Sequence, residues 1–503
     1  MARRITRAQK RELTPKPAAP AYLMRTTPPY EILSEEALCL VEQRADDILE
    51  QIGVEVRHDA SLQLLRKAGA DVNGTRVRLP RGLCRAIVTD TAPRNFVQHA
   101  RNQQRSVGFG GNGCILAPAY GPPFVSGIDV PRRYATLDDF KNFVKLTQVS
   151  PNLHYAGGVV CEPTDIPVSK RHLDMVYGLI RYSDKPFMGM VTSGERAEDS
   201  TRMAELLFGP EFVATNCVLA GLINLNSPLV LDETMLDAAH VYARHGQATV
   251  ITPFIIAGAS GTTSVAGIVA QSLAEALVGM AITQLVRPGA PVVYGFIMLG
   301  MNMRTGGPLR FDETWKSMLA HGQLARRLGV PFRTGGSSSS SKLPDLQAGW
   351  EGAMYLTYSL LSGVNFLINA AGTLETGLTL NYEKYVLDCD MLGAAMGMLK
   401  AVDLSDDEFG LDAIREAGPA GNFLATPHTM ARYRDAFYES SLSDGNSFEQ
   451  WQNDGALDAP QRANKYVRKA LEEYEPPPLD PAVDEALKDF VDRRKAMLPD
   501  SFA

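Results

Sequence analysis

The sequence predicts an α/β fold: a (β/α)8 barrel of the TIM type, with a small α+β region before it and a helical extension after it. Apolar, β-branched runs alternate eight times with helical patterns between residues 106 and 400, and that length suits such a barrel. Gly-rich polar segments follow the apolar runs, and barrel chemistry lies at that end of the strands. The GxGxxG match at Gly108–Gly113 is not followed by a helical pattern, and no GxxxxGK(S/T) motif follows a run, so a nucleotide-binding sheet is less well supported.

Four parts follow from these patterns. Residues 1–33 form a basic, Pro-rich arm, residues 34–105 a small α+β region, residues 106–400 the barrel, and residues 401–503 a C-terminal helical extension.

The α+β region begins with a helix over residues 34–52, which Ser34 caps and Gly53 ends. A second helix runs from Asp59 through Ala68. Residues 72–79 predict a hairpin that turns at Asn73-Gly74.

The barrel elements follow in order. Strands are expected to start near Val107, His154, Pro186, Cys217, Thr249, Pro291, Pro331 and Val364. Helices are expected over 136–149, 168–182, 196–208, 232–245, 264–286, 312–328, 345–361 and 382–399. Thr136 with Asp139 resembles a capping box, and Gly329 and Gly363 occupy positions where helices end.

Composition excludes several classes of protein. The net charge is −7, and basic residues gather only in the first dozen positions, so we expect no nucleic-acid partner. The six cysteines lie far apart without CxxC pairs, which favours reduced thiols and a cytoplasmic location. Residues 264–286 are apolar, but Gln271, Glu275 and Gln284 interrupt them, which indicates a buried helix and no membrane span.

The ends of the predicted strands supply the candidate site. We expect one rim to carry Gly111, Asn224, Arg304, Gly336 and Asn369, because glycines and polar residues follow the apolar runs.

The segment from Thr334 to Glu351 predicts a strand end, an open polar loop and a capped helix. The loop contains two glycines, Gly335 and Gly336, then five consecutive serines and Lys342, the only charge in the loop. A Ser run is often a flexible linker. Its place between an apolar strand and an apolar helix favours a site loop, in which glycines allow close approach of a ligand. We assign catalytic roles to Gly336, Ser341 and Lys342.

The sequence contains few signs of a metal site or of a catalytic nucleophile. The eight histidines are scattered, no HExxH or Cys-His cluster occurs, and we predict no metal. No GxSxG motif is present. Lys342 leaves open a Schiff-base barrel lyase, although such a lysine is usually desolvated within the strand wall.

A binding cup is the third possibility, since rings attract a quaternary ammonium. Aromatic residues near the predicted mouth are Phe109, Tyr120, Phe124, Tyr294, Phe296, Trp350 and Tyr355. Asn224, Asn226, Asn302, Arg304 and Asn369 are candidates to fix a polar or anionic group, and Glu162 and Glu375 to neutralise a cation. A non-catalytic binder of quaternary amines or corrinoid is compatible with the same residues.

Four phrases resemble the trimethylamine methyltransferase family: ILEQIGVEVRHDASLQLLRKAGADV from Ile48, GGSSSSSKLPDLQAGWE from Gly335, NFLATPHTMARYR from Asn422 and FEQWQNDGALDAPQRA from Phe448. The resemblance implies a barrel that moves a methyl group from a methylated amine to cobalt(I) of a corrinoid (cobalamin) carried by a partner protein. Archaeal trimethylamine enzymes of the family carry pyrrolysine in the loop that resembles Ser338–Lys342, where this chain has ordinary residues. The departure favours a quaternary amine such as glycine betaine.

The resemblance also directs the remaining assignments. Gly111, Gly335, Ser338 and Ser339 are expected at the corrinoid. The substrate is expected to contact Phe109, Tyr120, Glu162, Asn224, Asn226, Tyr294, Phe296, Arg304, Tyr355, Asn369 and Glu375. We expect a homo-oligomer.

Overall fold

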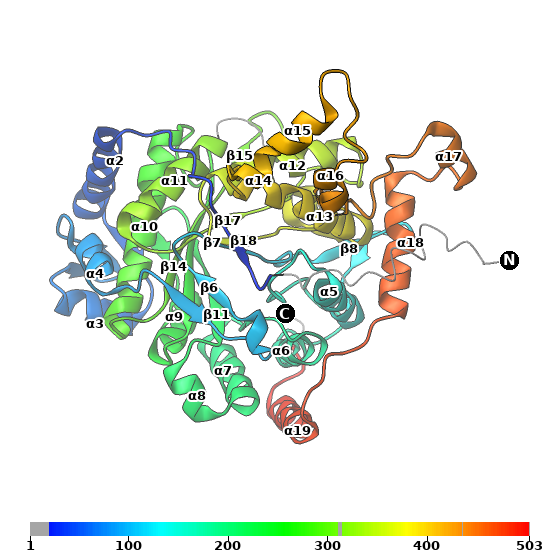
Figure 1. The fold of residues 1–503 in the computed structure, drawn as a ribbon. Coiled ribbons are helices and arrows are strands. Elements are labelled where there is room, and N and C mark those ends of the chain that lie inside the picture. The colour runs from blue at the N-terminus through cyan, green and yellow to red at the C-terminus, as the bar shows by residue number, and fades with distance from the viewer. Residues whose placement is uncertain (1–19, 310–313, 435, 502–503) are drawn as a thin grey trace.

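The computed structural model describes residues 20–309, 314–434 and 436–501. It is a mixed α/β structure in which helices lie outside a central set of strands (Figure 1). The expected α/β class is confirmed.

Seven parallel strands form the centre. In the order in which neighbours pair, they are β7 (Gly113–Leu116), β18 (Phe366–Ile368), β17 (Phe332–Gly335), β14 (Val292–Gly295), β13 (Ala248–Ile256), β11 (Leu219–Asn226) and β10 (Phe187–Met188). Residues 154–157 lie between the two ends of this series. The His154 N–H donates to Leu116 O on β7 over 2.9 Å, and the Ala156 N–H donates to Pro186 O over 2.8 Å. Gly157 also forms a parallel bridge with Phe187 of β10.

The helices between the strands match their predicted positions within a few residues. They are α5 (Leu137–Val149), α6 (Arg171–Tyr182), α7 (Gly194–Phe208), α9 (Glu233–Arg244), α10 (Val265–Val286), α11 (Thr314–Leu328), α12 (Leu346–Leu361) and α13 (Tyr382–Ala395). Thr136 and Asp139 form the expected capping box of α5. Ser264 and Asp345 cap α10 and α12 through their side chains.

The strands have a helix-covered face and an inner face. On the helix-covered face, Ile251 packs against Gly279 of α10, and the Phe296 ring stacks 3.6 Å from the His321 ring of α11. Because side chains alternate along a strand, their neighbours point the other way. The inner face includes one buried apolar cluster formed by Phe109, Ile115, Tyr155, Met188, Leu222, Val250, Val293, Phe366 and others.

The expected first strand is wrong. Residues Val107–Phe109 form β6, which pairs antiparallel with β5 (Phe96–Gln98), and β7 is the first strand of the parallel series. Gly110 and Gly111 make the turn between them with φ values of 98° and 51°, a region that favours glycine. Gly111 therefore precedes its parallel strand and lies near Asn365, at the end opposite the predicted rim.

The N-terminal α+β region packs beside α10, as Figure 1 shows for its blue helices. Its elements are α2 (Glu35–Asp47), a π-helical turn (Ile48–Ile52), β2 (Val54–Val56), α3 (Asp59–Lys67), β3 (Asp71–Asn73), β4 (Arg76–Arg78) and α4 (Leu83–Thr91). Ser34 caps α2, and β3 pairs with β4 as the expected hairpin.

Two smaller groups of strands complete the sheets. The antiparallel pair β15 (Ile297–Met301) and β16 (Pro308–Leu309) forms a hairpin after β14. A separate sheet contains β19 (Thr373–Leu374), β20 (Thr379–Asn381), β8 (Phe124–Ser126) and β9 (Arg133–Tyr134).

The C-terminal segment is helical and packs on the outer helices. It contains α14 (Asp406–Phe409), α15 (Leu411–Ala417), α16 (Pro427–Arg432), α17 (Phe448–Asn453), α18 (Ala459–Glu472) and α19 (Pro481–Met497). Helix α18 packs on α13 and α5, and α19 packs on α6 and α7 (Figure 1).

Helix α10 is the one helix in the described part of the chain that is long and apolar enough to cross a membrane. Its most apolar stretch is 83% buried inside the protein, and neighbouring helices cover it. It is therefore a core helix, as its interrupting polar residues predicted.

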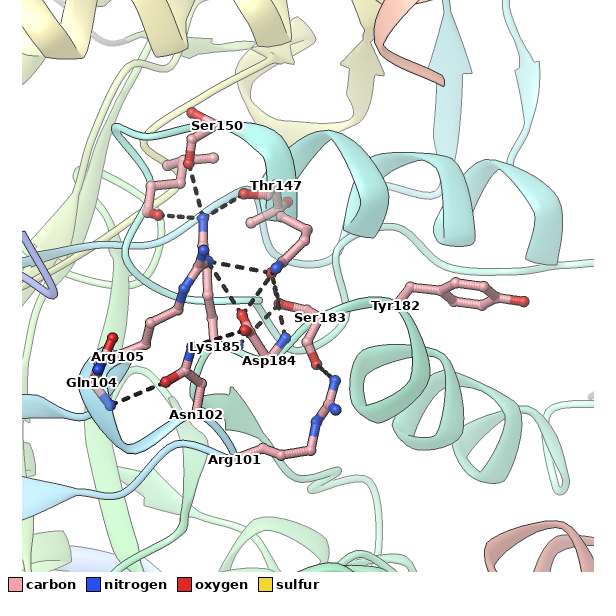
Figure 2. Close-up of polar contacts among 12 residues, drawn as sticks. Arg101, Asn102, Gln104, Arg105, Thr147, Ser150, Tyr182, Ser183, Asp184 and Lys185 are labelled. Atoms are coloured by element: carbon pink, nitrogen blue, oxygen red, sulfur yellow. Dashed lines mark hydrogen bonds and ion pairs between the residues drawn. The ribbon is translucent and has the colours of Figure 1, made fainter. Parts of the chain in front are cut away.

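Lys185 joins the end of α5 to the start of β10 (Figure 2). Its Nζ donates to the carbonyl oxygens of Thr147, Ser150 and Leu153 over 2.6, 2.9 and 2.7 Å. Burial lowers the pKa of Lys185 to about 7, whereas three carbonyl acceptors favour the ammonium form, because a neutral amine has only two N–H groups. Its neighbour Asp184 accepts from Asn102 and Gln148. All three N–H groups of the Lys185 ammonium therefore have acceptors within the fold.

Candidate active site at the carboxyl ends of the strands

The serine run after β17 is held by two acidic residues and a lysine. Ser339 Oγ and Ser340 N donate to the Glu351 carboxylate over 2.8 and 2.6 Å. Ser341 Oγ donates to Asp345 over 2.9 Å. Lys384 Nζ donates to Ser337 Oγ over 3.1 Å.

Lys384 is itself paired inside the protein. Its Nζ lies 2.5 Å from Asp388 Oδ2, and the Gly372 N–H donates to the same carboxyl. Burial raises the pKa of Asp388, and Lys384 opposes that rise. The ion pair thus anchors both Ser337 and the backbone that follows β18.

The backbone of the serine run also pairs with residues 373–376. Ser338 bridges Thr373, the Glu375 N–H donates to Ser341 O, and the Thr376 N–H donates to Ser339 O. We expected an open loop, but the structure fixes it along its length. The hydroxyls of Ser338 and Thr373 are buried without a hydrogen-bond partner in the part of the chain that the structure describes.

The two glycines before the serines are tightly packed. A Cβ at Gly335 would lie 2.8 Å from the Tyr355 hydroxyl, and a Cβ at Gly336 would lie 2.7 Å from Ala370 Cα and 2.9 Å from Asn369 O. Neighbouring backbone therefore requires glycine at position 336. A substitution there would disturb the fold, contrary to the expectation of a free loop position.

Lys342 lies on the surface, and its Nζ donates to Ser340 O over 2.8 Å. It lacks the desolvated setting that a Schiff-base lysine uses. The structure therefore gives no support to a lyase that depends on Lys342.

Asn369 and Tyr120 meet where β18 and β7 end. Asn369 Oδ1 accepts from the Tyr120 N–H over 2.8 Å, while the Asn369 backbone adopts φ 60°. Asparagine tolerates that left-handed conformation better than most residues. The Tyr120 hydroxyl is buried and has no hydrogen-bond partner among the described residues.

Arg333 lies in the middle of β17 and is 2% exposed. It pairs in register with Gly295 of β14 and Phe366 of β18. Because Phe366 belongs to the inner cluster, Arg333 shares the inner face. Burial lowers the pKa of Arg333 to about 10, and Tyr355 and Tyr120 oppose the shift. Its Nε and Nη1 have no hydrogen-bond partner in the described chain.

The two predicted carboxylates are already paired. Glu375 accepts from Arg132 over 2.7 and 2.9 Å, and its φ of 50° is unusual for a residue with a side chain. Glu162 lies 2.7 Å from Arg171, and burial raises the pKa of Glu162. Glu162 also raises the pKa of Tyr120, so those two groups are close.

Three predicted cage residues belong to the core. Tyr294 and Phe296 are fully buried on the helix-covered face beside His321, because the inward positions of that segment are Val293, Gly295 and Ile297. Phe109 is buried against Phe96 with ring centroids 4.6 Å apart, at the amino ends of the strands. The expectation that these three rings line the mouth is wrong.

The predicted polar residues lie in different settings. Asn224 is half-buried on the inner face of β11, in register with Thr252. Asn226 is exposed and donates to Asp232 at the start of α9. Arg304 is exposed in the turn of the β15–β16 hairpin.

Two side chains of the inner face were missed by the sequence reasoning. Phe254 is 40% exposed although it lies within β13, in register with Asn226 and Ile297 at the carboxyl end. Arg333 is the other. The signal for Arg333 was present, since a charge in a short apolar strand is rarely buried without a partner.

No group of three or more His, Cys, Asp or Glu residues in the described ranges is arranged to hold a metal ion. A cavity of about 300 Å³ lies at the amino ends of the strands near Cys217 and Pro291. A second, of about 630 Å³, lies between α5, α13 and Tyr438. Both are away from Arg333 and Tyr120.

Two characterised methyltransferases are similar to this chain over most of its length. The chain is 39% identical over 469 residues to the glycine betaine methyltransferase of Desulfitobacterium hafniense (strain Y51), spanning 93% of this chain and 98% of that protein. It is 28% identical over 457 residues to the proline betaine:corrinoid methyltransferase of Eubacterium limosum, spanning 86% and 91%.

A solved structure shares the fold. The monomethylamine methyltransferase of Methanosarcina barkeri superposes with a TM-score of 0.50 over 89% of each chain, at 10% identity. The family model for trimethylamine methyltransferase (MTTB) matches residues 2–499. A match of that length, with the 39% identity above, shows that the chain belongs to the trimethylamine methyltransferase family.

Proposed function

We propose that this protein transfers a methyl group from a quaternary amine, glycine betaine or a close analogue, to the cobalt of a corrinoid. The observation that carries the proposal is the nearly full-length similarity to a glycine betaine methyltransferase. The ordinary residues Ser338–Lys342 support a quaternary substrate over trimethylamine.

We further propose that the parallel strands form a (β/α)8 barrel, with the α+β region before residue 106 and the extension after residue 400 as separate parts. The hydrogen bonds of His154 and Ala156 support the barrel, because they link β7 to β10 through residues 154–157.

The chemistry requires little acid–base work from the protein. A bound corrinoid would supply cobalt(I), whose electron pair would form the new bond to the methyl carbon, and the amine would leave with the electron pair of the C–N bond. The quaternary nitrogen is already a competent leaving group, so the residues need to orient the substrate and exclude water. Tyr120 and Phe254 offer rings to the cation, and Glu162 lies beside Tyr120.

A partner that carries the corrinoid is supported by apolar side chains at the carboxyl ends of the strands. Met303 packs beside Gly258 after β13, and Leu346 and Trp350 lie at the start of α12, yet all three are exposed. Exposed apolar groups gathered at one end are typical of an interaction surface. We place the protein in the cytoplasm, and we expect it to form a homo-oligomer.

Turnover of a panel of methylated amines with free cob(I)alamin tests the function. We expect the cob(I)alamin spectrum to convert to that of methylcobalamin with glycine betaine, together with the demethylated amine. Failure with every quaternary amine, alongside turnover of trimethylamine, would overturn the proposed substrate.

Two controls address the alternatives. Borohydride trapping of a carbonyl substrate on Lys342 would support the Schiff-base lyase instead. Tight binding of a quaternary amine without any demethylated product would support a binding protein.

A further inference from the structure

We propose that Arg333 binds the carboxylate of the substrate, so that this protein selects quaternary amines with a carboxylate over those without one. The inference rests on the proposed function and specifies its substrate class.

The first observation is a buried charge with unused donors. Arg333 is 2% exposed, and neither Nε nor Nη1 finds an acceptor among the described residues. Burying an unpaired ion is strongly unfavourable, so a guanidinium in this position is expected to have a counter-ion during function.

Arg25 is also buried with one unpaired atom, Nη2, but it lies beside Asn112 before β7, at the amino ends of the strands. The two buried lysines use their donors within the fold. Lys185 reaches three carbonyl oxygens, and Lys384 reaches Asp388 and Ser337. Among the described residues, no carboxylate shifts the pKa of Arg333: the titratable groups that do are the phenols of Tyr355 and Tyr120.

The second observation is the position of the guanidinium. Register with Phe366 and Gly295 places Arg333 on the inner face, where the Thr252 side chain fills the space over Gly295. An arginine can donate two hydrogen bonds to a carboxylate, either from Nε and Nη2 or from Nη1 and Nη2. Each of these pairs contains one of the two unpaired atoms.

The third observation is a second unused donor nearby. The Tyr120 hydroxyl is buried without a partner among the described residues, and the Arg333 charge opposes the burial that raises the pKa of Tyr120. Glu162 acts on Tyr120 with the opposite sign. Tyr120 therefore feels one positive and one negative group, and a zwitterion with its carboxylate toward Arg333 would suit both charges.

The test compares glycine betaine with choline, which replaces the carboxylate by an alcohol. In the wild type we expect both binding and turnover to favour glycine betaine. Arg333→Met removes the charge at similar length. It should lower kcat/KM for glycine betaine about 10- to 100-fold, as expected for loss of charge-assisted hydrogen bonds. The value for choline should change less than about threefold, well inside the spread of one weak neutral contact.

Calorimetric binding of both amines to the same proteins, without cobalamin, provides a second readout. Arg333→Met should lose most of the binding of glycine betaine and little of that of choline. Arg326→Met, which changes an arginine of α11 bonded to Ser362 O, is the matched control and should leave the ratio of the two affinities unchanged.

The outcomes separate the inference from the function. Turnover of glycine betaine by the wild type with an unchanged preference in Arg333→Met would overturn the inference and leave the function standing. A wild type that binds glycine betaine through Arg333 but demethylates no amine would overturn the function alone. If Arg333→Met does not fold, Arg333→Lys decides: weaker binding of glycine betaine but not of choline supports the inference, and unchanged binding overturns it.

Discussion

Lys185 and Arg333 are both buried cations beside parallel strands, but they use their charges differently. Lys185 precedes β10 at the amino end and donates to three carbonyl oxygens (Figure 2). Arg333 lies within β17 and keeps Nε and Nη1 unpaired in the described chain. A buried cation with every donor engaged stabilises the fold, whereas the open donors of Arg333 remain for the ligand that we propose.

The two ends of the strands are less sharply divided, because Arg25 Nη2 and His154 Nε2 at the amino ends also lack a partner among the described residues. At the amino ends, the Asn365 side chain donates to the carbonyl oxygens of Gly111 and Gly113. Lys185 donates to the Thr147 carbonyl oxygen in the last turn of α5. At the carboxyl ends, Tyr120 and Ser338 keep open hydroxyls among the described residues. The comparison is therefore between the two residues: we expect changes of Lys185 to affect stability and changes of Arg333 to affect binding.

The largest expected effect is that of Lys185→Met. Three buried carbonyl oxygens would lose their donor, and each unsatisfied group costs about 1–3 kcal/mol. We expect the free energy of unfolding, measured with denaturant, to fall by about 3 kcal/mol or more. A loss below about 1 kcal/mol would show that water replaces the ammonium group, which would weaken the comparison.

A pH effect of intermediate size is expected from His154. Its Nδ1 accepts from the Leu116 N–H, and burial lowers its pKa from 6.5 to about 3. As the pH is lowered below 6.5, His154 therefore takes up a proton in the unfolded chain before it does so in the folded protein. The free energy of unfolding decreases as the pH is lowered from 6.5 to 3. Near pH 5 this amounts to about 2 kcal/mol.

His154→Asn keeps an acceptor for Leu116 but does not titrate. Unfolding measured across this pH range should show a weaker dependence in the variant than in the wild type. Equal slopes would mean that His154 is protonated in the folded protein.

Arg333→Met should have a small effect on stability, in contrast to Lys185→Met. Replacing an unpaired buried ion by an apolar side chain is often neutral or stabilising, so we expect a loss of no more than about 1 kcal/mol. Glycine betaine should raise the melting temperature of the wild type and not of the variant. A loss as large as that of Lys185→Met would remove the distinction between the two cations.

The smallest effect is expected from Lys342→Ala. This side chain is exposed, and surface substitutions usually change stability by less than about 0.5 kcal/mol. Methyl transfer should persist, measured with cob(I)alamin. Complete loss of activity would restore the Schiff-base alternative.

Local signals explain the accuracy of the helix predictions. The capping box of Thr136 and Asp139 and the caps at Ser264 and Asp345 depend on residues three positions apart, which the sequence displays directly. The first strand failed for the opposite reason. Val107–Phe109 and Gly113–Leu116 are both strand-like, and only pairing with the distant β18 distinguishes them.

The candidate site was harder to predict because strands buried on both faces lack alternation. Tyr294 and Phe296 look the same in sequence as rings that face inward, yet they pack against α11. The serine run was located correctly beside the carboxyl ends. Its partners Glu351 and Lys384 were not anticipated, since only the folded chain brings Lys384 near Ser337.

The fixed serine run has a consequence for the thermodynamics of binding. Residues 337–341 are already held by Glu351, Lys384 and the backbone of residues 373–376. A loop that is ordered beforehand loses little conformational entropy when a ligand arrives. The unfavourable entropy of binding should therefore come mainly from the substrate's own lost motion, and affinity should depend on the contacts that the substrate makes.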